Sequence, residues 1–198
     1  MMRIGPVLAV LFVAVAGCHR SPADCPSGAQ LHGNKPPDGQ LQWCARSDGV
    51  KNGPWREWHA NGNAKSVGTY VDGKMEGKWQ TFSEDGSLKT EGVYTGGLKD
   101  GVWTQYYDKG EGGTKNRVEE HHVGSSEVKW TAYRSSGAKW AEGTELGSQP
   151  NGPYTEYHSD GKVAVKGNYA AGAKIGEWSY FDKDGKPSST PTGSFDQR

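Results

Sequence analysis

Residues 77–94 read Gly-Lys-Trp-Gln-Thr-Phe-Ser-Glu-Asp-Gly-Ser-Leu-Lys-Thr-Glu-Gly-Val-Tyr, and the fold can be inferred from this stretch. Asp85-Gly86 in its middle is a strong hairpin signal, because both residue types tolerate a positive φ angle. In the segment that follows, apolar, small and glycine residues alternate with polar ones, which is the period of a β-strand. The stretch therefore predicts two short strands joined by a tight turn.

The same pattern recurs in six units along the chain. The units start at residues 53, 77, 101, 128, 152 and 176, with spacings of 24, 24, 27, 24 and 24 residues. The first strand of each unit carries two aromatic residues, which are Trp55 and Trp58, Trp79 and Phe82, Trp103 and Tyr106, Trp130 and Tyr133, Tyr154 and Tyr157, and Trp178 and Phe181. The extra residues of the third unit fall within 111–116, which predicts a longer hairpin tip. A partial unit at 39–52 precedes the array, which ends at residue 185.

The composition excludes an ordinary globular core. The chain is 33% hydrophobic with 30 glycines, and leucine and isoleucine are scarce after residue 17. It is also too rich in aromatic residues to be disordered. We therefore predict an all-β protein, an extended antiparallel β-meander of hairpins about 24 residues long, in which each unit packs on its neighbours.

The repeat pattern resembles a known family. Gly-x-Trp-x-x-Tyr, then Asp-Gly or Asn-Gly, then Glu-Gly-x-Tyr is similar to the variant MORN repeats found in bacteria, over residues 53–185. The resemblance implies a single-layered β-meander without catalytic residues and without a cofactor. Some proteins with these repeats are described as antitoxin-like. The fourth unit departs from the pattern, with Val128 in place of glycine and Glu145 in place of tyrosine.

The mid-strand glycines and the paired aromatic residues of the repeat each lead to a structural expectation. Glycine weakens a strand, so the mid-strand residues Gly68, Gly92, Gly143 and Gly167 need a reason. We expect an aromatic ring from the adjacent strand to lie flat over each of them.

The paired aromatic residues of a unit stand three apart, so either both faces of the sheet carry an aromatic row or a bulge brings the two together. The rings form either the core of the array or a surface that grips a ligand.

The beginning of the chain predicts export and a lipid anchor. An apolar run from Val7 to Ala16 follows Arg3, and its ten residues would reach only about 15 Å as a helix, too little to span a bilayer. The run ends in Val-Ala-Gly-Cys18, which resembles the lipobox of bacterial lipoproteins. That resemblance implies removal of residues 1–17, acylation of Cys18 and attachment to a membrane. By the same resemblance, His19 points to the outer membrane if the host is Gram-negative.

The remaining cysteines and the flanking segments complete the layout. Cys25 and Cys44 would lie in an oxidising compartment, which favours a disulfide between them over two free thiols. Residues 18–38 are rich in proline and polar residues and are predicted to be a flexible tether. Residues 186–198 form a Ser/Thr-rich C-terminal tail.

The sequence gives little indication of a catalytic site, a metal site or a nucleic-acid-binding surface. After removal of residues 1–17, 22 basic residues face 23 acidic ones, which argues against a nucleic-acid partner. Glu119-Glu120-His121-His122 contains metal-ligand residue types but is explained as a polar strand, and the turn at 182–185 lacks the glutamate of a calcium loop. No nucleophile motif and no phosphate-binding loop occur, so we expect neither an enzyme nor a metal site.

Three hypotheses of function follow. The first is a non-catalytic, lipid-anchored scaffold that holds a protein partner at the cell envelope, as repeat proteins commonly do. The second is binding of cell-wall glycans through exposed aromatic rings. The third is a toxin-neutralising role, suggested by the family resemblance.

Overall fold

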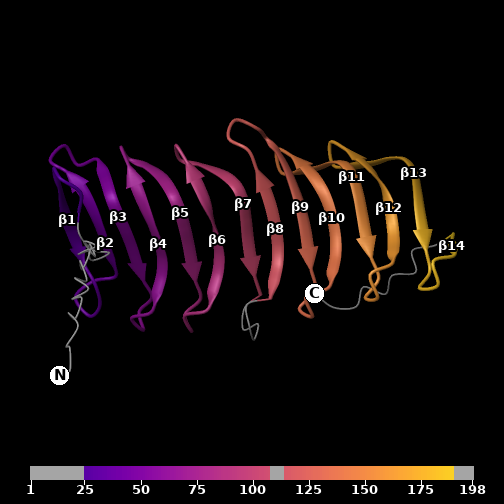
Figure 1. The fold of residues 1–198 in the computed structure, drawn as a ribbon, viewed down its shortest axis with the longest axis horizontal. Coiled ribbons are helices and arrows are strands. Elements are labelled where there is room, and N and C mark those ends of the chain that lie inside the picture. Colours follow the sequence, from indigo (N-terminus) through magenta and orange to yellow (C-terminus); the bar gives the residue numbers. More distant parts are fainter. Residues whose placement is uncertain (1–24, 108–113, 190–198) are drawn as a thin grey trace, which may run out of the picture.

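The computed structural model describes residues 25–107 and 114–189, which form one antiparallel sheet of 14 strands. Every strand pairs with its neighbours in sequence, so the strand order is β1 to β14 without a crossover. Figure 1 shows the strands side by side in a single extended layer. The predicted antiparallel β-meander is confirmed. Among the described residues, no helix is long and apolar enough to cross a membrane.

Each unit supplies two strands, and its first strand ends on the second aromatic residue. The bounds are β1 Ala29–Asn34, β2 Leu41–Arg46, β3 Lys51–Trp58, β4 Ala64–Val71, β5 Lys74–Phe82, β6 Leu88–Thr95, β7 Leu98–Tyr106, β8 Lys115–His121, β9 Glu127–Tyr133, β10 Lys139–Leu146, β11 Gln149–Tyr157, β12 Val163–Ala170, β13 Ala173–Phe181 and β14 Pro187–Ser188. The sixth unit is thus incomplete in the described residues, because its second strand has only two residues.

The turn follows one geometry in the five units other than the third, whose predicted longer hairpin tip lies largely outside the described residues. In the first unit, the Gly62 amide donates to the His59 carbonyl at 3.0 Å, and the His59 amide donates to the Asn63 carbonyl at 2.9 Å. Gly62 has a φ of 87°, so a tight turn is closed by one residue in the left-handed region, where glycine is favoured. Four of the five links between units are two-residue turns such as Asp72-Gly73, in which both φ angles are positive, at 49° and 80°.

In the five units that start with glycine, this glycine lies in a bulge. Between β4 and β5 the register passes from Val67 opposite Gln80 to Thr69 opposite Glu76, and Gly77 lies inside the irregularity with a φ of 69°. A residue with a Cβ rarely adopts that angle. The fourth unit has Val128 at this position, and there the β8–β9 ladder runs without a register shift. Replacement of the starting glycine by Val128 therefore goes with the loss of the bulge between the two strands.

The N-terminal and C-terminal boundaries differ from the prediction. Residues 18–38 are predicted to be a tether, yet Ala29–Asn34 form β1 and pair along β2, so that part of the prediction is wrong. The disulfide between Cys25 and Cys44 holds this segment against the sheet, with 5.5 Å between the two Cα atoms. Similarly, Pro187 and Ser188 of the expected tail pair with β13. Backbone hydrogen bonding to a neighbouring strand outweighed the local composition in both places.

Candidate binding surfaces

One face of the sheet, which we call the tryptophan face, carries a row of aromatic rings. A continuous run has centroids 4.9–6.3 Å apart and consists of Trp43, Trp55, Tyr70, Trp79, Tyr94 and Trp103. A second run contains Trp130, Tyr154, Tyr169 and Trp178. Most of these contacts are tilted or edge-to-face, which are favourable arrangements of aromatic rings. The row therefore joins each unit to the next and acts as a thin core.

The expected contact between rings and mid-strand glycines is confirmed. A Cβ on Gly68, Gly92 or Gly167 would overlap the indole of Trp79, Trp103 or Trp178, the tryptophan of the following unit. The nearest ring atoms are those at the fusion of the indole, so its face covers the backbone. Gly143 differs, because the preceding Trp130 lies over it at 3.1 Å.

The second aromatic residue of each unit lies on the opposite side, which we call the reverse face. The hydroxyl of Tyr106 donates to Glu91 at 2.8 Å, and Glu91 precedes Gly92, whose other side is covered by Trp103. Successive residues of a strand point to opposite faces, so Tyr106 is on the reverse face. Both faces thus carry an aromatic row, which settles an alternative that the sequence left open. Trp58, Phe82, Tyr133, Tyr157 and Phe181 occupy the equivalent position in their units.

The carboxylates beneath the reverse-face tyrosines are held by ion pairs. Glu91 is 2.9 Å from Lys78, and Glu142 is 2.8 Å from Lys139. The hydrogen bonds from Lys78 and Tyr106 lower the pKa of Glu91, while burial and the bond to Glu91 raise the pKa of Tyr106 to about 12. Tyr106 therefore stays protonated at neutral pH and bonds the third unit to the second, and the hydroxyl of Tyr157 likewise donates to Glu142 of the preceding unit.

The tryptophan face contains a groove of about 400 Å³ over β3–β7. Its walls are the rings from Trp55 to Trp103, and polar side chains such as Thr81, Thr90 and Gln105 line the rest. Lys51 lies 4.3 Å from the ring centroid of Trp55, and Lys99 lies 4.6 Å from that of Trp103. These ammonium groups cover ring faces by cation–π contact. The groove therefore offers ring edges and hydroxyls more than open ring faces.

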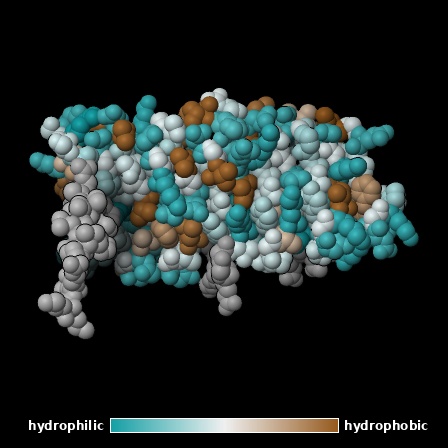
Figure 2. Space-filling view, in the orientation of Figure 1, coloured by the Kyte–Doolittle hydropathy of each residue, from teal (hydrophilic) through white to brown (hydrophobic). Residues whose placement is uncertain are grey.

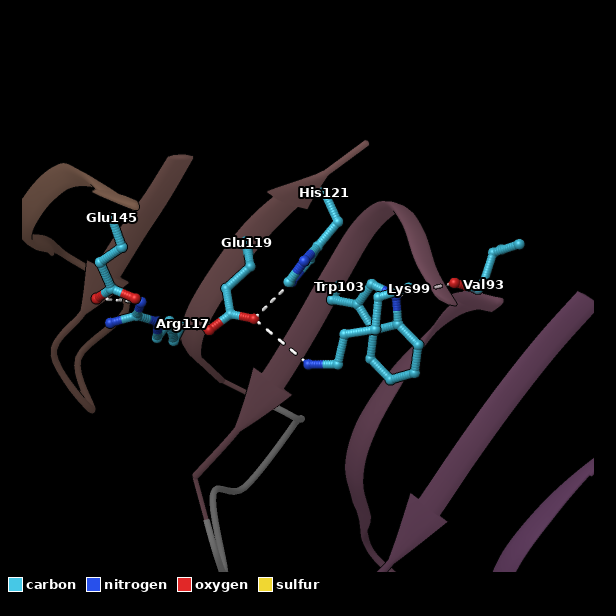
Figure 3. A network of polar contacts seen from close by, with 7 residues as sticks. All are labelled: Val93, Lys99, Trp103, Arg117, Glu119, His121 and Glu145. Atoms are coloured by element: carbon cyan, nitrogen blue, oxygen red, sulfur yellow. Dashed lines mark hydrogen bonds and ion pairs between the residues drawn. The ribbon is translucent and has the colours of Figure 1, made fainter. Parts of the chain in front are cut away.

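A charged cluster interrupts the aromatic row between Trp103 and Trp130. Glu119 accepts a hydrogen bond from Arg117 and one from His121, each at 2.8 Å, and lies 3.5 Å from Lys99. Arg117 also bonds Glu145 on β10 at 2.8 Å. Figure 3 shows the Glu119 carboxylate between His121 and Lys99, with Trp103 beside them. The cluster thus replaces the ring contacts with ion pairs across β7, β8 and β10.

Glu119 is the centre of this cluster. Its side chain is only 13% exposed, and burial by itself would raise its pKa. The hydrogen bond from His121 and the charges of Lys99 and Arg117 outweigh burial, so the pKa of Glu119 lies below its usual value. The carboxylate is therefore ionised at neutral pH and holds together three basic side chains.

The reverse face contains a second groove, of about 530 Å³, over β7–β11. Val102, Val118, Thr131, Thr155 and Pro153 supply its β-branched and proline floor, while Glu120, Lys129 and Glu142 add charges. Val102 is 59% exposed. Figure 2 shows one face of the molecule, on which apolar side chains form several separate patches among polar ones.

Three segments match the MORN repeat variant, namely residues 51–72, 75–95 and 150–171. The chain carries MORN repeats. The matched segments cover the strand pairs β3–β4, β5–β6 and β11–β12. No match is found among curated proteins.

The strands around the charged cluster depart from the MORN pattern. Glu119 and His121 stand on β8 where β6 has Gly92 and Tyr94, and Glu145 stands on β10 in place of a tyrosine. With no glycine at 119, an indole cannot lie against the β8 backbone. Trp130 accordingly covers Gly143 instead, and Arg117 lies 4.5 Å from its ring centroid. The replacements at residues 119, 121 and 145 and the different position of the Trp130 ring therefore depend on one another.

The predicted lipid attachment site and the segments that contain metal-ligand residue types remain to be located in the structure. Cys18, the predicted lipid attachment site, lies outside the described residues. No group of three potential metal ligands converges within residues 25–107 and 114–189. The carboxylate of Asp182 accepts the backbone amides of Asp184 and Lys186, so this segment forms an ordinary turn.

Sequence reasoning missed a set of links between units. The residue after the second aromatic donates to a backbone carbonyl of the second aromatic in the next unit: His59 to Phe82, Tyr107 to Tyr133, Arg134 to Tyr157 and His158 to Phe181. His158 is buried, and its Nε2 donates at 2.9 Å. The four residues share no chemical type except a donor at the end of the side chain, so no sequence pattern marked the position.

Proposed function

We propose that this protein is a non-catalytic binding module, held at a membrane of the cell envelope by a lipid on Cys18, which presents its reverse face to a protein partner. MORN repeats are commonly modules that bind proteins or membranes, and this supports a scaffold role. The observation that carries the proposal is the reverse-face groove, whose lining residue Val102 is exposed.

The composition of that groove suits a protein partner. In this groove the apolar side chains of Val102, Val118 and Pro153 lie among threonines and charges of both signs, including Glu120 and Lys129. Such a mixture is typical of interfaces between proteins that also exist separately. A flat sheet of repeats further provides a rigid platform, because each strand is fixed by its neighbours.

Site-specific photo-crosslinking in cells tests this proposal. A photo-reactive amino acid at Val102 should give one dominant protein adduct, which is lost when Val118→Glu places a charge in the groove. The same amino acid at Lys183, on an exposed hairpin tip, is the matched control and should give no such adduct. Identical adducts from both positions, or none from Val102, would contradict the proposal.

A second candidate function is glycan binding in the groove of the tryptophan face. Aromatic walls with hydroxyl and amide groups at Thr81, Thr90 and Gln105 favour it. Lys51 and Lys99 oppose it, because they occupy ring faces on which a sugar would stack. Addition of peptidoglycan fragments should shift tryptophan emission if this candidate is correct, and an unchanged spectrum across a broad glycan panel would eliminate it.

A further inference from the structure

The backbone pairing between β8 and β9 is shorter than that of the other links between units. In the four other links, the ladder continues to the two-residue turn, as at Val71 opposite Lys74 between β4 and β5. The β8–β9 ladder has four pairs, and its last one, Glu120 opposite Lys129, stops before the connecting residues 122–126. We call residues 117–120 and 129–132 the β8–β9 joint. Fewer paired residues therefore hold its two strands together.

The tryptophan contact that fastens other links is also missing from the joint. Across β4 and β5, the indole of Trp79 lies over Gly68, and its Nε1 donates to the Thr69 carbonyl at 3.2 Å. The same pair of contacts occurs across β6 and β7. At the joint, Trp130 lies over Gly143 of its own unit, and its buried Nε1 has no hydrogen-bond partner among the described residues. No indole therefore fastens β9 to β8.

Arg117 replaces that contact on the tryptophan face. Its guanidinium lies 4.5 Å from the ring centroid of Trp130 on β9 and bonds Glu145 on β10 at 2.8 Å. At the hairpin-tip end, the hydroxyl of Tyr107 donates to the Tyr133 carbonyl at 2.7 Å. On the tryptophan face, the joint thus depends on one ion pair and one cation–π contact in place of an indole packed on the backbone.

The joint also forms the floor of the reverse-face groove. Val118 opposite Thr131 and Glu120 opposite Lys129 are pairs of its ladder, and all four residues line the groove. The remaining lining residues lie on both sides of the joint, on β7 and on β10 and β11. Separation of β8 from β9 would therefore divide the groove into two halves.

We propose that the β8–β9 joint opens locally while the strands on either side stay paired, and that Arg117 holds it closed. Regions of a protein with fewer apolar contacts open at a lower free energy than the rest. Partly exposed ion pairs stabilise a fold only weakly, whereas the rings that lie over glycines bury apolar surface. Opening would change the groove that a partner meets, a consequence that rests on the proposed function of that groove.

Hydrogen–deuterium exchange of the full-length protein, followed by mass spectrometry of its peptides, tests the joint without a partner. Peptides that cover β8 and β9 should exchange at least about tenfold faster than those that cover β5 and β6. Equal protection of the two pairs of strands would overturn the proposal. Because no partner is present, the result does not depend on whether the groove binds a protein.

Substitution of Arg117 tests what holds the joint closed. Arg117→Ala removes both of its contacts with the following unit and should accelerate exchange of β8 and β9 roughly tenfold further, with β5 and β6 unchanged. Glu145→Ala, which removes the ion pair alone, should give a smaller acceleration at the same two strands. Unchanged exchange at the joint in both variants, or equal acceleration of every strand, would overturn the proposal.

Glu91→Ala is the matched control. It removes an ion pair with Lys78 and the hydrogen bond from Tyr106, which joins the third unit to the second. The indole of Trp103 still lies over Gly92 there, so exchange of β6 and β7 should change much less than exchange of β8 and β9 does in Arg117→Ala. Equal acceleration at the two places would show that the missing indole contact does not weaken the joint, and would overturn the proposal.

Discussion

The indole ring of Trp103 lies against the backbone at Gly92, in the space that a side chain of residue 92 would occupy. Its Nε1 donates to the carbonyl of Val93 at 2.9 Å, which fixes the ring in that position. Trp103 and Gly92 belong to consecutive units and to adjacent strands. The contact therefore joins the units to each other and explains why glycine occurs in the middle of a strand.

A comparison of two glycine substitutions tests this contact. Gly92→Ala should lower the free energy of unfolding by about 1–3 kcal/mol, because the new methyl group overlaps the Trp103 ring. Gly143→Ala is the matched control and should cost less, since a Cβ there would lie 3.1 Å from Trp130. Urea denaturation measures both. Equal losses of stability in the two variants would show that ring overlap is not the reason for the glycine.

The charged cluster should make stability depend on pH. The folded state lowers the pKa of Glu119 below its usual value of 4.5, so this group stabilises the fold above that pH. The contribution should be lost as the pH falls through the lowered pKa. Glu119→Gln should therefore reduce the difference in unfolding free energy between about pH 7 and about pH 3. If the wild type and the variant lose the same stability on acidification, Glu119 does not act as inferred.

The disulfide should stabilise the N-terminal end of the array. Its two cysteines are 19 residues apart, and closing a loop of that size contributes roughly 3 kcal/mol in the chain-entropy model. The double variant Cys25→Ser, Cys44→Ser should lose about that amount, measured by denaturation without reductant. Adding reductant should destabilise the wild type and leave the double variant unchanged. A reductant effect on the variant would point to another cause.

The membrane anchor makes a separate prediction. Cys18→Ser should move the protein from the membrane fraction to the soluble fraction, because two or more acyl chains are needed for firm attachment and the variant cannot carry them. Cys25→Ser is the control and should remain in the membrane fraction. Immunoblotting of fractionated cells distinguishes the two. Membrane retention of the Cys18 variant would mean that a different anchor exists.

The repeat period was readable from the sequence because glycine, tryptophan and Asp-Gly residues each have a local conformational reason for their position. Tight turns require positive φ at Gly62 and its equivalents, and that requirement acts on a single residue. The ring-over-glycine contact at Gly92 followed from the same reasoning, since only close approach of another group explains a mid-strand glycine. The boundary at β1 did not follow, because residues 29–34 gain their strand only by pairing with β2.

The sequence alone determined the hairpin period, the turn positions and the absence of a conventional core, because these depend on neighbouring residues and on composition. Only the tertiary structure decided which face each ring occupies and that Glu119, Arg117 and Glu145 meet in one cluster. Those features depend on register between strands. Register is set by bulges such as the one at Gly77, and a small shift there changes which side chains meet across the sheet.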